Sequence, residues 1–262
     1  MLLLGLASVT FRERSAPDVV RLAVEAGSEV VEWAADRHVR PGDRAAATAV
    51  RDACAAAGLR VGTYGSYHKA GADDPAAFAD VVATAAELGA PRVRVWGGTR
   101  ASAQVSPAQR AGTVDALRRC ADAVAARGMA LLVEHHVESL TDGLDTALAL
   151  RDEVGHPALL THWQPRELPV TDDCLAEVRA LRPATVHAFS WGADGFTERL
   201  PLADRADLWS PVLAELAAQA TAAGTPVEVL LEFVPGDTAA SLLRDAAALR
   251  DLRAGRDLAG VR

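Results

Sequence analysis

The chain has 262 residues, half of them hydrophobic, so it can bury a large core, and α/β barrels of this length often form one domain. The formal net charge of -8 and the pI near 5.4 argue against nucleic acid and anionic membranes as partners, because both carry negative charge themselves. The three cysteines, Cys54, Cys120 and Cys174, form no CxxC pair. They predict neither a zinc ribbon nor a disulfide framework, which fits a reducing, cytoplasmic location.

Short runs rich in leucine or β-branched residues recur along the chain and predict strands. In chain order they cover residues 2–8, 29–34, 59–67, 91–98, 129–136, 157–165, 184–191 and 227–234. The first run has no basic segment before it and is too short to cross a bilayer. It is therefore interpreted as a first strand and not as a signal peptide or a membrane span.

The segments between these runs carry apolar residues at helical spacing. Residues 17–27, 75–90 and 111–128 are examples, and several such segments end at a glycine, as helices often do. Strands that alternate with helices predict parallel βαβ units, and eight units of about 33 residues fit a (β/α)8 TIM barrel in a single domain, residues 1–262. The alternative is a doubly wound sheet. It is less favoured because ASVTFRERSAP, which follows the first run, lacks the glycine-rich turn of a nucleotide site.

Four of the later predicted strands run into a side chain that can ligate a metal. These side chains are Glu134, Gln164, His187 and Glu232. Each alone has an ordinary explanation, such as a solvated loop carboxylate or a hydrogen-bonded core histidine. In a TIM barrel, however, the carboxyl ends of the strands form the active-site mouth, so four neighbouring strand ends can converge there. Together they predict one site for a divalent ion.

Several segments together resemble a known family. They are VEW with RHV (31–39), TYGSY (63–67), VRVWGG (93–98), VEHHVESLTDG (133–143), HWQP (162–165), VHAFSW (186–191) and LLEFVPGD (230–237). In these segments the chain resembles the sugar phosphate isomerases and epimerases of the xylose-isomerase-like barrels, a group that includes D-tagatose and D-psicose 3-epimerases. The resemblance extends over nearly the whole chain.

The resemblance implies one divalent ion, Mn²⁺ or Mg²⁺, held by Glu134, Gln164, His187 and Glu232. Gln164 stands where the family usually has an aspartate. Its amide oxygen is neutral, so the site loses one negative charge and weaker binding of the ion is expected.

Two further positions depart from the epimerases. Glu167 stands where those relatives carry a substrate-binding histidine, and Leu140 stands where they carry a glutamate. Both departures weaken the transfer of ketose 3-epimerase specificity to this chain.

The function implied by the resemblance is isomerisation or epimerisation of a small sugar or sugar derivative. Glu134 and Glu232 would be the catalytic pair, one removing a carbon-bound proton beside the carbonyl and the other returning it through an enediolate. A lyase, dehydratase or hydrolase on the same barrel stays open, as does a barrel that binds sugar without catalysis.

Polar and aromatic residues near the strand ends predict a sugar pocket around the ion. They are Glu32, His38, Tyr67, Trp96, His136, Trp163 and Arg199. Aromatic faces stack on the apolar faces of sugars, and histidine or glutamate can hydrogen-bond hydroxyl groups. For Trp96 the alternative is packing in the barrel wall, and for Arg199 it is solvation. The expected partner is a sugar-like small molecule, and formation of a homo-oligomer stays open.

Overall fold

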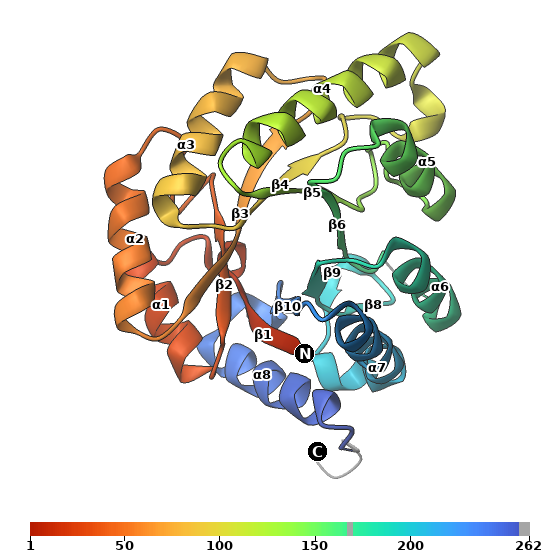
Figure 1. Cartoon of the computed structure of the whole chain (residues 1–262). Coiled ribbons are helices and arrows are strands. Elements are labelled where there is room, and N and C mark those ends of the chain that lie inside the picture. Colours follow the sequence, from red (N-terminus) through yellow and green to blue (C-terminus); the bar gives the residue numbers. More distant parts are fainter. Residues whose placement is uncertain (167–169, 257–262) are drawn as a thin grey trace.

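Eight parallel strands close into a barrel in the computed structural model, which describes residues 1–166 and 170–256 (Figure 1). The barrel strands are β1 (Leu2–Ala7), β2 (Val30–Ala34), β3 (Arg60–Lys69), β4 (Arg92–Trp96), β5 (Ala130–Glu134), β6 (Leu159–Trp163), β7 (Thr185–Ala188) and β10 (Val227–Leu231). Their order around the barrel is β1-β10-β7-β6-β5-β4-β3-β2, so the first strand pairs with the last. Every predicted strand segment forms one of these strands, and the predicted single-domain (β/α)8 barrel is confirmed.

Helices surround the barrel between successive strands (Figure 1). They are α1 (Ala16–Glu25), α2 (Arg44–Ala56), α3 (Phe78–Leu88), α4 (Pro107–Ala125), α5 (Leu144–Val154), α6 (Thr171–Leu181), α7 (Ala206–Ala223) and α8 (Ala239–Arg253). Short 3-10 turns are η1 (Ser8–Phe11), η2 (Pro75–Ala77), η3 (Ser102–Gln104), η4 (Leu202–Arg205) and η5 (Pro235–Asp237). Within residues 1–166 and 170–256, no helix combines the length and the apolar character needed to cross a membrane.

Local sequence signals set the ends of these helices. Ser106 caps α4 by accepting a hydrogen bond from the backbone of Gln109, whose side chain in turn accepts one from the Ser106 backbone. Helices α3, α5 and α7 each end at a glycine in the left-handed conformation, namely Gly89, Gly155 and Gly224. Glycine adopts this conformation without steric cost, which explains why the predicted helical segments stop there.

Alternation along the strands separates two layers of side chains. The outward-facing residues, such as Trp33 on β2 and Leu131 on β5, are fully buried against the helices in the main hydrophobic core. The barrel interior has a much smaller apolar cluster. It consists of Leu3, Ala7, Val9, Val30, Ala34 and Leu230. Much of the interior is instead occupied by polar and charged side chains, and these form the site described below.

One element of the fold was not predicted from the sequence. Strands β8 (Trp191–Gly192) and β9 (Gly195–Arg199) form an antiparallel hairpin that follows β7. Trp191 and Arg199 face each other across the hairpin, with the Arg199 guanidinium 5.8 Å from the Trp191 ring centre. The hairpin therefore adds two side chains to the carboxyl end of the barrel.

Gly5 allows a test of the barrel packing. A Cβ at Gly5 would collide with the Val30 carbonyl oxygen on β2 and would lie 2.9 Å from Leu230 Cδ2 on β10. Both neighbours belong to paired strands and cannot move away independently, so Gly5→Ala is expected to lower the free energy of unfolding by about 3 kcal/mol. Gly112→Ala in α4 is the matched control, because nothing lies within 4 Å of its added Cβ and alanine favours the helix by roughly 1 kcal/mol. Urea denaturation of both variants measures the difference, and equal midpoints would contradict the packing argument.

Candidate active site

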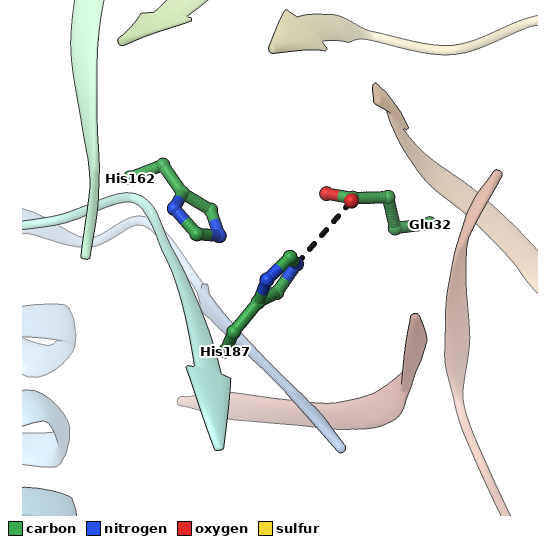
Figure 2. Close-up of side chains that lie close together, drawn as sticks. All are labelled: Glu32, His162 and His187. Atoms are coloured by element: carbon green, nitrogen blue, oxygen red, sulfur yellow. Dashed lines mark ion pairs between the residues drawn. The ribbon is translucent and has the colours of Figure 1, made fainter. Parts of the chain in front are cut away.

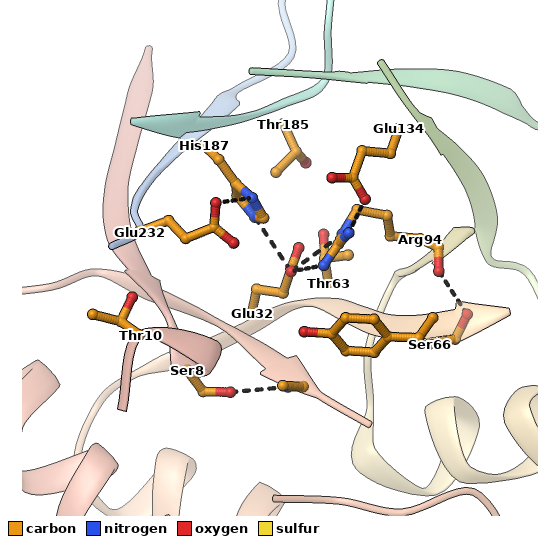
Figure 3. A network of polar contacts seen from close by, with 12 residues as sticks. Ser8, Thr10, Glu32, Thr63, Ser66, Arg94, Glu134, Thr185, His187 and Glu232 are labelled. Atoms are coloured by element: carbon orange, nitrogen blue, oxygen red, sulfur yellow. Dashed lines mark hydrogen bonds and ion pairs between the residues drawn. The ribbon is translucent and has the colours of Figure 1, made fainter. Parts of the chain in front are cut away.

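Four charged side chains meet inside the barrel (Figure 3). Glu32, Arg94, Glu134 and Glu232 are 2, 3, 4 and 6% exposed and extend from the region of β2, β4, β5 and β10. The Arg94 guanidinium donates to Glu32 Oε1 through Nη2 at 2.7 Å and contacts Glu134 through Nη1. One buried guanidinium therefore pairs with two carboxylates. Burying these charges without a partner of opposite charge would be costly.

His187 extends the network from Glu32 to Glu232. Its Nε2 lies 3.2 Å from Glu32 Oε1, and its Nδ1 lies 3.2 Å from Glu232 Oε2. Burial alone would lower the pKa of His187, but Glu232 and Glu32 outweigh it and raise the pKa to about 10. Burial alone would raise the pKa of Glu32, but Arg94 and His187 outweigh it and lower the pKa to about 2. At neutral pH the network thus holds an ionised Glu32 beside a protonated His187.

Glu134 is anchored on several sides. Trp96 Nε1 donates to Glu134 Oε2 at 2.5 Å, and the same oxygen contacts Arg94. The Thr141 hydroxyl donates to the Glu134 backbone carbonyl at 2.5 Å. The Trp96 ring stacks on His136 with centroids 4.5 Å apart. The position of Glu134 is therefore set by its neighbours.

A cavity of about 590 Å³ lies among residues that follow the carboxyl ends of the strands. Its lining consists of His135, His136, Val137, Asp142, Gln164, Pro165, Arg166, Phe189, Trp191, Arg199 and Phe233. Phe189, Trp191 and Phe233 form an aromatic wall with centroid distances of 5.4, 5.7 and 5.9 Å, and Arg199 lies 4.9 Å from the Phe233 ring centre. This volume is typical of a site for a small molecule.

Backbone strain occurs at the same end of the barrel. Tyr67 at the end of β3 has φ of 58°, and Phe233 just after β10 has φ of 53°. Bulky residues seldom adopt this left-handed conformation, and such strain persists where the surrounding structure holds it, often at functional sites. Phe233 lines the cavity, and the Tyr67 ring lies 5.7 Å from the Arg94 guanidinium.

The structure brings together most of the predicted metal ligands. Glu134, His187 and Glu232 face the barrel interior, and Gln164 lines the cavity beyond the end of β6. The role of Gln164 as a ligand stays a prediction.

The predicted pocket residues divide into several groups. His136 and Arg199 line the cavity, Trp96 lies against His136, and Tyr67 accepts a hydrogen bond from Arg12 at 3.2 Å. Glu32 lies in the interior network described above.

Two predicted pocket residues lie elsewhere. His38 packs on the edge of Trp33 with ring centroids 5.8 Å apart. Trp163 lies in the outer layer, where its Nε1 donates to Glu177 Oε2 at 2.8 Å, because alternation along β6 turns it away from the interior. Glu167 lies outside the described residues.

Two interior residues, Arg94 and His162, were not predicted from the sequence as part of the site. Arg94 alternates with apolar residues in the run VRVW, which places it on the same side of β4 as Trp96. His162 stands two residues before Gln164, so alternation along the predicted strand 157–165 places both on the same side. A charged or imidazole side chain at an inward position of a barrel strand was the available signal in both cases.

The interior donors fit a divalent cation. Among the residues that the structure describes, Glu32, His162 and His187 form the one group of His, Cys, Asp or Glu side chains whose ligand atoms all lie within 4.8 Å of one another (Figure 2). Around this group, Arg94 pairs with Glu32 and Glu134, and His187 lies against Glu32 and Glu232. If a bound ion displaces the proton of His187, the three carboxylates and the Arg94 guanidinium leave two negative charges unbalanced. One divalent ion would balance them.

Fold and site together define a (β/α)8 barrel with a polar, carboxylate-rich interior beneath a cavity at the carboxyl ends of its strands. The chain belongs to the xylose isomerase-like TIM barrel family, whose model matches residues 20–165. This confirms the family resemblance seen in the sequence. No curated protein sequence matches the chain.

Several solved structures share the fold. A probable 3-DHS dehydratase from Bacillus anthracis has a TM-score of 0.76 at 20% identity, covering 95% of this chain and 99% of that one. A D-allulose 3-epimerase from Methylomonas sp. has a TM-score of 0.67 at 17% identity, covering 96% and 98%. A xylose isomerase domain protein from Alicyclobacillus acidocaldarius has a TM-score of 0.70 at 20% identity, covering 97% and 98%.

Proposed function

We propose that this protein is a divalent-metal-dependent isomerase or epimerase of a small sugar or sugar derivative. The observation that carries the proposal is the placement of two buried carboxylates, Glu134 and Glu232, on opposite sides of the barrel interior (Figure 3). Their strands β5 and β10 are separated in the barrel by β6 and β7. Two carboxylates that face each other across a site can act on two faces of one carbon or on two adjacent carbons.

Each carboxylate has neighbours suited to proton transfer. Arg94 and Trp96 hold Glu134 in place beside a positive charge, and His187 lies against Glu232. In the proposed reaction one of these groups, as the carboxylate, accepts the proton from the carbon beside the carbonyl, and the other, as the carboxylic acid, supplies a proton to the product. A bound divalent ion, with Mn²⁺ or Mg²⁺ expected from the family resemblance, would supply Lewis acidity toward the substrate oxygens.

The cavity supports a sugar-like substrate. Phe189, Trp191 and Phe233 offer an apolar wall for the carbon face of a sugar, while His136, Gln164 and Arg199 offer hydrogen bonds to hydroxyl groups or to an acid group. The cytoplasmic location and the formation of a homo-oligomer stay predictions.

Dehydration is the second candidate, and His136 favours it. The His136 ring lines the cavity and stacks on Trp96, which also hydrogen-bonds Glu134. After proton removal by Glu134, an imidazole at this position could protonate a leaving hydroxyl group, so that water is lost instead of a proton being returned. An α,β-unsaturated carbonyl product, which absorbs in the ultraviolet, distinguishes this outcome from an isomer or epimer.

Solvent deuterium exchange tests the proposed function. Protein loaded with Mn²⁺, Mg²⁺, Co²⁺ or Zn²⁺ is incubated in D₂O with a panel of ketoses, aldoses and sugar acids, and deuterium at carbon is measured by NMR. We expect incorporation beside the carbonyl for at least one compound, and no incorporation with the Glu134→Gln/Glu232→Gln double variant. Binding of a sugar without exchange under any metal would instead support a non-catalytic sugar-binding barrel.

A further inference from the structure

Three inward-facing side chains beneath the cavity are almost completely buried. Glu32, His162 and His187 are 2, 0 and 0% exposed. Among the described residues, Glu32 Oε2 and both ring nitrogens of His162 have no hydrogen-bond partner. Leaving a buried polar atom unpaired costs about 1–3 kcal/mol, so these atoms indicate a missing partner in the barrel interior.

The geometry of this group also suits a ligand set. The two imidazole rings lie edge to face with centroids 4.1 Å apart, and Glu32 lies on the other side of His187 (Figure 2). A neutral imidazole nitrogen is the form that binds a metal.

Glu134 is less available as a ligand than the family resemblance implies. Its Oε2 already contacts Arg94 and accepts a hydrogen bond from Trp96. Glu32 also contacts Arg94, but through Oε1 only, which leaves Oε2 unpaired. Arg94 therefore pairs with Glu134, which was predicted as a ligand. It leaves Glu32 Oε2 available to bind an ion.

We propose that this chain binds its divalent ion through Glu32, His162 and His187, with Arg94 holding Glu134 outside the ligand set. The proposal deepens the proposed function and rests on its metal dependence. It shares His187 with the four residues expected from the family resemblance, and Glu32 and His162 take the places of Glu134 and Gln164.

The donor set changes the metal that is expected. Two imidazole nitrogens and one carboxylate suit Zn²⁺, Co²⁺ or Fe²⁺, whereas Mg²⁺ prefers oxygen ligands. Competition between metals in the chelator-treated wild-type protein should therefore place Zn²⁺ and Co²⁺ well ahead of Mg²⁺. Equal affinity for Mg²⁺ and Co²⁺ would contradict the proposed set.

A Co²⁺ titration compares the two ligand sets. Chelator-treated wild type, His162→Ala and Gln164→Ala are titrated with Co²⁺ and followed by visible absorption and calorimetry. We expect His162→Ala to weaken binding by at least about 100-fold, because loss of a neighbour that merely orients a ligand already costs 10- to 100-fold. Gln164→Ala should change the affinity by less than about 3-fold. The reverse pattern would overturn the proposal in favour of the set that contains Gln164.

A measurement on the wild type removes the dependence on variants that fold poorly. Protein labelled with ¹⁵N-histidine is loaded with one equivalent of Cu²⁺, and pulsed EPR counts the imidazoles coupled to the ion. Two coupled imidazoles are expected, whereas the set that contains Gln164 supplies one. One imidazole, or no bound ion, would overturn the proposal.

These outcomes separate the ligand set from the proposed function. One coupled imidazole together with metal-dependent deuterium exchange removes the ligand set and leaves the function intact. Two coupled imidazoles without exchange for any compound support the ligand set and count against the isomerase or epimerase function.

Discussion

Replacement of Glu232 by glutamine is expected to lower turnover by a factor on the order of 10² to 10⁴. The amide keeps the size of the side chain and an oxygen beside His187 Nδ1, which lies 3.2 Å from Glu232 Oε2, but it cannot accept a proton. Glu134→Gln should behave similarly, because its carboxylate faces the interior from the other side. Since neither residue belongs to the Glu32, His162 and His187 group, Co²⁺ affinity should stay within a few-fold of the wild type in both variants.

Glu228→Gln is the matched control for this experiment. Glu228 lies on the same strand as Leu230, near the amino end of β10, where it pairs with Arg92 at 2.5 Å. Burial raises the pKa of Glu228 against the opposing effect of Arg92, so a neutral amide is a modest change there. Steady-state turnover of the three variants is measured on the substrate found by deuterium exchange. It tests whether Glu134 and Glu232 transfer protons. Near-normal turnover in both Glu134→Gln and Glu232→Gln would exclude proton transfer by this pair.

Arg94→Met is expected to lower the free energy of unfolding by about 3–5 kcal/mol at neutral pH, because it leaves buried carboxylates without their cation. Arg94 is 3% exposed and contacts both Glu32 and Glu134, and methionine fills part of the volume without supplying a charge. Arg92→Met is the matched control. It removes an inward arginine from the same strand, but among the described parts of the chain its ion pair involves Glu228 alone. A smaller loss is therefore expected.

The destabilisation caused by Arg94→Met should depend on pH. In the metal-free wild type, the pKa of Glu32 is about 2, below its ordinary value of 4.5. A lowered pKa contributes stability that is fully present above about pH 4.5 and is lost as the pH falls towards 2. Because Arg94 is a main cause of this lowering, the gap between variant and wild type should be largest above pH 4.5 and narrow towards pH 2.

Urea denaturation of chelator-treated protein at several pH values measures this gap. A gap that stays constant from neutral pH to acid would show that Arg94 acts through packing alone. Arg94→Lys adds a second comparison, since it keeps a positive charge but loses the planar fork that contacts two carboxylates at once. An intermediate loss of stability is expected for that variant.

The order of strands and helices was determined by the sequence itself. Apolar runs of strand length, separated by segments of helical spacing that end at residues such as Gly89 and Gly155, are local signals. The same local signals placed Glu134, His187 and Glu232 at the mouth of the barrel, because each lies at or next to the carboxyl end of an apolar strand and these ends meet at one face. The hairpin β8–β9 escaped prediction because its strands are short and interrupted, without a regular alternation.

Which interior side chains contact one another follows only from the tertiary structure of the closed barrel. Alternation shows that Arg94 and His162 face inward, but the pairing of a residue on β4 with Glu32 on β2 and Glu134 on β5 depends on strand register and on the distance across the barrel. These contacts join residues that are 62 and 40 positions apart in the chain. Trp163 was predicted to contact the substrate because it stands near a strand end. In the folded protein it faces the outer layer, where its Nε1 donates to Glu177. The charge balance of a buried network depends on all of its residues together, so it cannot be predicted from any single segment of the sequence.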